Sequence, residues 1–184
     1  MYHHLKDTVT SEIRLVLDAV EEERIRQLMQ SILSARTVVV HGAGRVGLAC
    51  KAFSMRLGHL GRTAYAASDS TVPPVGTGDL VIVASSSGET QTSFDVGYLA
   101  KKNGAKIAVI TAATHSRIGG LADVLIELKT QTKFGPTEDR ASIQPMATLF
   151  EQSLQILFDV LVLMLMSETR QSHADLWSRH SNLD

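Results

Sequence analysis

The chain has 184 residues and a mass of 20.0 kDa, so we expect one domain, spanning 1–184, that is large enough to bury a core. Its 18 Lys and Arg residues nearly balance 19 Asp and Glu residues, and it has no long basic run, which argues against nucleic acid or a membrane surface as a partner. The single cysteine, Cys50, excludes an internal disulfide and a multi-cysteine metal site, and it favours the reducing cytoplasm as the location.

The first part of the chain has apolar residues at helical spacing from Ile13 to Ile32, which predicts one amphipathic helix that ends near Ala35. Five short β-rich runs follow, mostly separated by segments of helical length, over 38–40, 63–67, 80–84, 107–111 and 124–128. Gly61 and Gly104 stand where the intervening helices should end, because glycine accepts the left-handed backbone of a helix C-cap. The pattern predicts a three-layer α/β fold, with a five-stranded parallel sheet and helices on both faces.

The last part of the chain begins with the longest irregular stretch, 129–144, and Pro145 after it suits the first turn of a final helix. The most apolar part of that helix, 156–166, is interrupted by Asp159 and is shorter than the roughly 20 residues that cross a bilayer. We therefore expect a buried helix. Its broad apolar face fits the core and a subunit interface equally well.

Two loops rich in glycine and hydroxyl residues, 42–47 and 85–90, each follow a predicted strand and precede a predicted helix. Such a turn directs unpaired backbone N–H groups and the positive end of the helix dipole toward one point, which favours a phosphate. If the strands take the flavodoxin-like order 2-1-3-4-5, both loops open at the crevice between strands 1 and 3. The residues expected to bind the phosphate are Gly44, Arg45 and Val46 in the first loop and Ser85, Ser86, Ser87, Gly88, Glu89 and Thr90 in the second.

Each loop also has another interpretation. The first loop satisfies the dinucleotide-binding pattern G-x-G-x-x-G, and Asp69 lies past the second predicted strand, where such a fold places an acid for the ribose. Either loop can also be a tight turn without a ligand. The hydroxyl groups of the second loop favour a compact phosphate monoester, which a dinucleotide fold does not require.

Several short motifs extend over nearly the whole chain: Gly42-Ala43-Gly44-Arg45, Lys51-Ala52-Phe53, Met55-Arg56-Leu57, His59-Leu60-Gly61, Ser87-Gly88-Glu89-Thr90, Gln144-Pro145-Met146, Leu149-Phe150-Glu151-Gln152 and Arg179-His180-Ser181-Asn182-Leu183. With these motifs the chain resembles the sugar isomerase (SIS) domain family, and most closely the 6-phospho-3-hexuloisomerases. The resemblance implies conversion of arabino-3-hexulose 6-phosphate to fructose 6-phosphate, without a cofactor. It also implies a homo-oligomer, a dimer or a tetramer, whose subunits complete one another's sites.

The chain departs from the family pattern at three positions near the loops. The family usually has serine where this chain has Val46, and glycine where it has Ser86 and Ala147. The first loop therefore lacks a phosphate-facing hydroxyl, although the Val46 backbone N–H is still a donor. A hydrogen bond to a charged group contributes about 1.5–3 kcal/mol, so we expect weaker binding or a shifted position of the phosphate.

Moving a carbonyl group from C3 to C2 requires a base that removes the C2 proton, an enediol intermediate, and delivery of a proton to C3. One carboxylate can perform both transfers, and the resemblance implies that Glu151 is this base. Glu151 is also suited to balance the dipole at the start of the last helix. His59 is the second catalytic candidate, as a group that polarises the carbonyl, and it is equally suited to the end of its helix.

Other polar residues have weaker signals. His180 lies in a tail that can cover a neighbouring site, Arg45 can neutralise phosphate or face solvent, and Glu89 can cap a helix. The remaining histidines lack metal-ligand spacing, so we expect no metal. Two alternative functions stay open: a non-catalytic sugar-phosphate-binding protein on the same domain and, third, a dinucleotide-binding protein.

Overall fold

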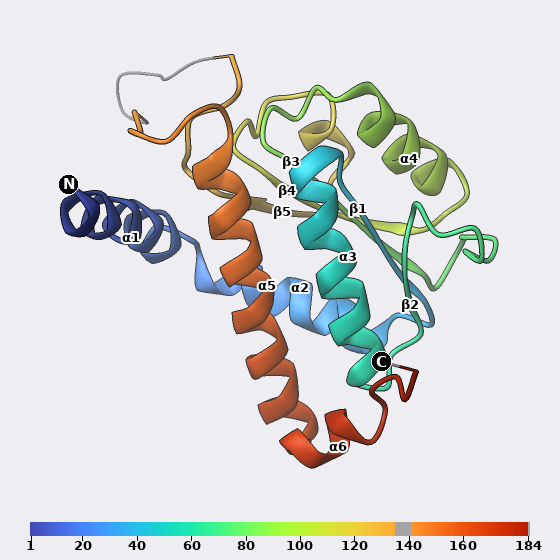
Figure 1. Cartoon of the computed structure of the whole chain (residues 1–184). Coiled ribbons are helices and arrows are strands. Elements are labelled where there is room, and N and C mark those ends of the chain that lie inside the picture. The colour runs from blue at the N-terminus through green and yellow to red at the C-terminus, as the bar shows by residue number, and fades with distance from the viewer. Residues whose placement is uncertain (135–140, 184) are drawn as a thin grey trace.

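The computed structural model describes residues 1–134 and 141–183, and a five-stranded parallel sheet forms its centre (Figure 1). The strands are β1 (Val38–His41), β2 (Ala64–Ala66), β3 (Leu80–Ser85), β4 (Lys106–Thr111) and β5 (Val124–Glu127). Their order is β2-β1-β3-β4-β5, and Val38 pairs with Ala64 on one side and with Leu80 on the other. The predicted α/β class, the parallel sheet and the strand order are confirmed.

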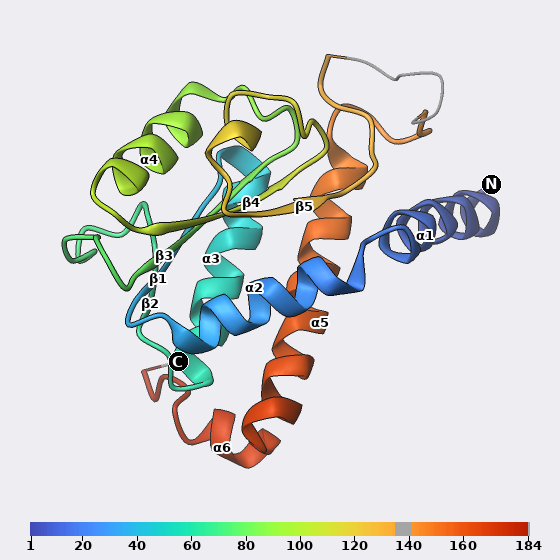
Figure 2. The same cartoon turned by 180° about the vertical axis from the view of Figure 1, so that it is seen from behind.

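Helices cover both faces of the sheet (Figures 1 and 2). The helices α2 (Glu22–Ser34), α3 (Gly44–His59) and α5 (Thr148–Thr169) pack on one face, and α4 (Gln91–Lys102) with the short 3₁₀ helix η1 (Gly119–Leu121) packs on the other. Val38 and Val40 belong to the first layer of the core, whereas Val39 belongs to the second, because successive strand residues point to opposite faces. Every residue of β3 is buried, as expected for a central parallel strand.

The N-terminal region forms two helices, which corrects the prediction of a single one. α1 (Tyr2–Asp18) extends away from the body of the molecule, and α2 begins after an extended residue, Glu21, with ψ 112° (Figure 2). The apolar spacing runs across the break because Val16 and Leu28 join the same core from different helices. A continuous hydrophobic period therefore hid the change of direction.

The glycine positions predicted to end helices have the expected backbone: φ is 76° at Gly61 and 89° at Gly104. Pro145 differs from its prediction, because it lies outside the last helix and its carbonyl accepts hydrogen bonds from Thr148. Met146, which lies between Pro145 and α5, has φ 57°, and this left-handed conformation separates Pro145 from the helix.

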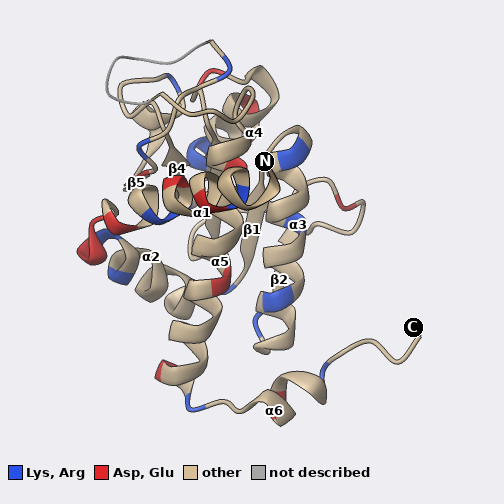
Figure 3. Ribbon diagram, turned by 60° about the vertical axis from the view of Figure 1, so that its left-hand side comes forward, with Lys and Arg blue, Asp and Glu red and all other residues tan. Residues whose placement is uncertain are grey.

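The helix α5 is long and apolar enough to cross a membrane by length and composition, and half of that stretch is buried inside the fold. Its inner face contributes Phe158, whose ring stacks on Phe53 of α3 at 4.1 Å between centroids. In Figure 3 most of the α5 ribbon is tan, the colour of residues other than Lys, Arg, Asp and Glu. Its outer face exposes Ile156, Val160 and Leu163. The predicted buried helix is thus a core helix with a second apolar face that the rest of the described chain leaves exposed. The short helix α6 (His173–Trp177) follows α5.

Candidate active site

The structure brings the two glycine- and serine-rich loops to one cavity of about 340 Å³. They meet there because β1 and β3 are parallel neighbours, so the loops that follow them leave the same edge of the sheet. The beginning of α5 and the segment after β5 complete the wall. The lining residues are Ala43, Gly44, Arg45, Val46, Ala84, Ser85, Ser86, Ser87, Thr90, Lys133, Met146, Ala147 and Glu151.

The first loop passes directly into α3, which begins at Gly44, and in the described part of the chain its N-cap, Ala43, has no side-chain capping hydrogen bond. Gly44 has φ 57°, and a Cβ atom on Gly47 would lie 2.6 Å from the Gly42 carbonyl oxygen. Glycine therefore allows the helix to start close against β1. The result is an uncapped helix N-terminus at the cavity, which attracts an anion.

The second loop contributes three buried serines, and two of their hydroxyl groups shape the loop itself. Ser85 Oγ accepts the Gly88 N–H at 3.2 Å and lies 3.4 Å from Thr90 Oγ1, while Ser87 Oγ accepts the Glu89 N–H at 3.3 Å. Ser86 Oγ is buried without a hydrogen-bond partner in the described part of the chain. The three serines line the cavity together with Thr90, the residue that precedes α4.

Gly88 and Glu89, which the sequence also suggested for phosphate binding, do not line this cavity. Gly88 has φ 65°, and a Cβ atom there would lie 1.8 Å from Ser116 Oγ. The Glu89 carboxylate accepts the Arg117 backbone N–H at 2.9 Å. Both residues therefore hold the loop against the segment around Ser116 and Arg117.

Glu151 lies in the first turn of α5 and forms an ion pair with Arg45 of the first loop. Its side chain is 16% exposed, whereas that of Arg45 is 67% exposed. The guanidinium supplies the opposite charge that a largely buried carboxylate requires. The structure thus combines a carboxylate and a cation beside the uncapped N-terminus of α3.

Sequence reasoning missed Lys133, which lines the cavity from the irregular segment after β5. A single lysine in a segment without periodicity carries no signal of its own. No carboxylate among the described residues pairs with its ammonium group, which lies 5.2 Å from the centroid of the Phe134 ring. The cavity therefore contains a second cation in addition to Arg45.

His59, the second catalytic candidate, lies far from this cavity within the same chain. It is the last residue of α3, whereas the cavity is at the first turn, and the rise of the helix separates these ends by about 22 Å. His59 is buried beside His180, with 5.1 Å between ring centroids, and its Nδ1 lies 3.3 Å from Arg56. Burial, with smaller effects of Arg56 and His180, holds the pKa of His59 below its ordinary value.

Asp69, the acid of the alternative dinucleotide interpretation, is part of a turn. Its carboxylate accepts the Ala66 N–H at 3.1 Å. A separate cavity of about 220 Å³ lies between the first loop and β2, and its lining includes Ser68 but not Asp69. In the described residues, no group of three or more His, Cys, Asp or Glu side chains is arranged to hold a metal ion.

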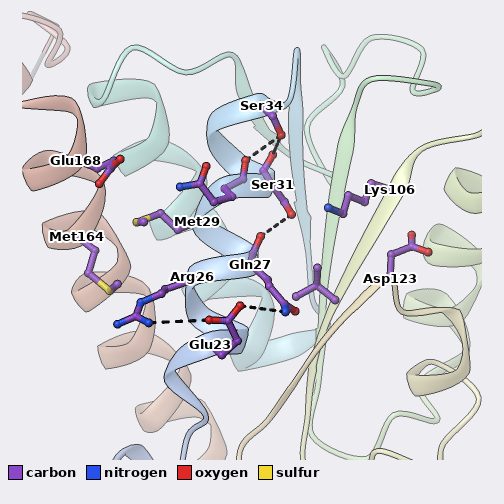
Figure 4. Close-up of a pocket in the computed structure, with 12 residues that line it drawn as sticks. Glu23, Arg26, Gln27, Met29, Ser31, Ser34, Lys106, Asp123, Met164 and Glu168 are labelled. Carbon is purple, nitrogen blue, oxygen red and sulfur yellow. Dashed lines mark hydrogen bonds and ion pairs between the residues drawn. The ribbon is translucent and has the colours of Figure 1, made fainter.

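A larger cavity, of about 760 Å³, lies at the opposite edge of the sheet (Figure 4). Lys106 and Val124, which line it, are the first residues of β4 and β5. Its other walls are α2 and α5, with charges of both signs such as Arg26 and Glu168. It shares no residue with the loop cavity.

Comparison with known proteins identifies the family. The SIS domain matches residues 31–167. The 3-hexulose-6-phosphate isomerase of Bacillus subtilis is 36% identical over 90% of this chain and 89% of its own length, and that of Mycobacterium gastri is 36% identical over 97% and 92%. A crystal structure of a hypothetical protein from Methanococcus jannaschii, for which a molecular function of 3-hexulose-6-phosphate isomerase has been inferred, superposes with a TM-score of 0.86 at 27% identity, covering 98% of this chain and 99% of the other. This chain therefore belongs to the SIS domain family.

Proposed function

We propose that this protein is a sugar-phosphate isomerase that converts arabino-3-hexulose 6-phosphate to fructose 6-phosphate. The observation that carries the proposal is the cavity in which the two loops and Glu151 meet. An uncapped helix N-terminus and a serine-rich loop suit a phosphate dianion, and the carboxylate at the same cavity suits proton transfer. The curated relatives named 3-hexulose-6-phosphate isomerase support this choice of substrate.

In the proposed reaction Glu151 removes the proton from C2, and the electrons of the C–H bond form the C2–C3 double bond. The C3 oxygen takes up a proton from a water molecule to give the enediol. The C2 hydroxyl then gives its proton to the resulting hydroxide, C2 becomes the carbonyl carbon, and Glu151 returns a proton to C3. The carboxylate ends in its original state, so the reaction is balanced without an added oxidant, reductant or cofactor. Arg45, which pairs with Glu151, keeps the carboxylate at the cavity wall.

The test is conversion of the 3-hexulose phosphate in heavy water, with fructose 6-phosphate and its deuterium content as the readout. Glu151→Gln should lower turnover by a factor of about 10²–10⁴, the usual contribution of a general base, and leave fructose 6-phosphate affinity within a few-fold. Glu168→Gln is the matched control, since it lies on the same helix beside the other cavity. Retained turnover in Glu151→Gln would remove Glu151 from the base role. Saturable binding by the wild type without turnover would instead indicate a sugar-phosphate sensor.

We also infer that the active form is a homo-oligomer. The outer face of α5 exposes Ile156 and Leu163, and the adjacent α3 exposes Leu48, which lines the same groove as Ile156. An apolar surface that spans two helices is typical of a subunit interface. If His59 and His180 act in catalysis, they do so at the cavity of a neighbouring subunit, because α3 keeps them away from their own.

A further inference from the structure

The carboxylate of Glu12 connects α1 to the segment that precedes α5. Glu12 accepts hydrogen bonds from the Ser142 hydroxyl at 2.7 Å, the Ile143 N–H at 3.0 Å and the Gln144 side-chain amide at 3.0 Å. These donors come from three consecutive residues, about 130 positions later in the sequence. A carboxylate with three donors is a charge-assisted anchor, stronger than an ordinary surface contact.

A second residue, Gln131, holds the same segment from the other side. Its side-chain amide donates to the Gln144 carbonyl at 2.7 Å and to the Met146 carbonyl at 3.2 Å, and its oxygen accepts the Ser142 N–H at 3.2 Å. Gln131 is buried, two residues before Lys133 of the cavity wall. We call 142–146 the strap. It is fixed between α1 and the segment that follows β5.

The strap leads directly into the candidate site. Met146 lines the cavity with φ 57°, a conformation that costs energy for a residue with a side chain and that persists only where its surroundings impose it. The next residue, Ala147, also lines the cavity, and its carbonyl accepts the Glu151 N–H at 3.0 Å. The position of the strap therefore sets where α5 begins and where Glu151 stands relative to the loops.

We propose that Glu12 is a positioning residue of the isomerase site, which holds the strap so that Met146, Ala147 and Glu151 keep their places around the cavity. This inference rests on the proposed function. The hydrogen bonds of Glu12 described above go to Ser142, Ile143 and Gln144, which do not line the cavity, so Glu12 acts through the strap. A purely structural alternative is that Glu12 attaches α1 to the body, but α1 already packs there through Ile13 and Val16.

The test compares Glu12→Gln with Asp18→Asn in the full chain. Asp18 is a suitable control because it is an exposed carboxylate on the same helix, and it pairs with Arg14 at 3.8 Å. The measurements are kcat and KM for the 3-hexulose phosphate, Kd for fructose 6-phosphate, and the rate of amide hydrogen exchange along the chain. We expect Glu12→Gln to lower kcat/KM between about tenfold and a hundredfold, as small misplacements at a site do, with faster exchange at 142–147 and unchanged exchange in β3. Asp18→Asn should match the wild type.

The outcomes separate this inference from the proposed function. Faster exchange in the strap with wild-type kcat/KM and Kd would overturn the positioning role, and so would unchanged exchange or a uniform increase over the whole sheet. If the wild type binds fructose 6-phosphate without turnover, the isomerase proposal fails, and the Kd values of the two variants still decide the role of Glu12. A wild type that binds no fructose 6-phosphate overturns both.

Discussion

Val46 occupies a position that serves the core and the cavity together. It is 7% exposed, it packs in the larger core cluster, and it lines the cavity where the family usually has serine. A serine there adds a hydroxyl donor to the phosphate but removes two methyl groups from the core. Affinity and stability are therefore expected to move in opposite directions.

We predict that Val46→Ser tightens fructose 6-phosphate binding by about tenfold, since one hydrogen bond to a charged group contributes about 1.5–3 kcal/mol. The free energy of unfolding should fall by about 1–2 kcal/mol because of the lost packing. Calorimetric titration and denaturant unfolding measure the two effects. Val46→Ala is the control, since it loses the packing without gaining the hydroxyl. Equal affinities of the two variants would mean that the backbone N–H groups already satisfy the phosphate.

Lys133 is the cation of the cavity that is not engaged with a carboxylate among the described residues, whereas Arg45 is paired with Glu151. We predict that Lys133→Met weakens fructose 6-phosphate binding by about tenfold, and that Lys133→Arg recovers most of the loss. The measurement is Kd at two salt concentrations, because losing a charge should also reduce the salt dependence. Lys129→Met is a control from the same segment outside the cavity lining. A Lys133→Met variant within twofold of the wild type at both salt concentrations would place the ammonium group in solvent.

At the scale of elements, Asp79 connects the starts of two neighbouring strands. Its side chain is 1% exposed and accepts hydrogen bonds from Arg36 at 3.1 and 2.8 Å and from the Gly76 N–H at 2.9 Å. Arg36 precedes β1 and Asp79 precedes β3, so this pair fixes the edge of the sheet opposite the loops. The hydrogen bonds from Arg36 hold the pKa of Asp79 below its ordinary value. Burial opposes this effect, and the hydrogen bond from Gly76 adds to it.

A carboxyl group whose pKa is lower in the folded than in the unfolded protein stabilises the fold above its unfolded pKa, and this contribution is lost as pH falls through the folded pKa. We predict that Asp79→Asn lowers the free energy of unfolding at pH 7 by about 2 kcal/mol, as expected for lost charge-assisted hydrogen bonds. The difference from the wild type should shrink below the ordinary pKa of an aspartate, about 3.9. Urea unfolding at neutral and acidic pH measures it, with the exposed Asp95→Asn as control. A difference that does not change with pH would assign the effect to packing.

The sequence predicted the elements whose signal is local and missed those set by distant contacts. The strands were recognisable because their β-rich runs end at turn residues, and the parallel order then placed the two loops together. The break after α1 was hidden because Val16 and Leu28 continue one hydrophobic period. The contact of Glu12 with the strap leaves no local pattern, since its partners lie about 130 residues away. The position of His59 follows from helix length, because α3 has 16 residues between its start and its end.

At the scale of the whole molecule, the catalytic candidates divide into two groups. Glu151 is at the carboxyl edge of the sheet, and His59 with His180 is at the other end of α3. The exposed apolar face of α3 and α5 runs between these ends, through Leu48, Met55 and Leu163. A neighbouring subunit that covers this face is in a position to bring its own His59 to the cavity.

This arrangement predicts complementation between inactive variants. Glu151→Gln and His59→Ala should each be nearly inactive alone, but a mixed oligomer contains sites that combine an intact Glu151 with an intact His59 of the neighbour. Random association of equal amounts should restore about a quarter of wild-type activity, since each site draws its two residues from different chains. The activity of the co-refolded chains measures this restoration, and sedimentation gives the size of the oligomer.

A mixture of Glu151→Gln with Glu151→Ala is the control and should stay inactive. If the oligomer forms and activity does not return, the neighbour's His59 does not complete the cavity that contains Glu151; full activity of His59→Ala alone would show that the histidine stabilises the end of α3 and takes no part in proton transfer.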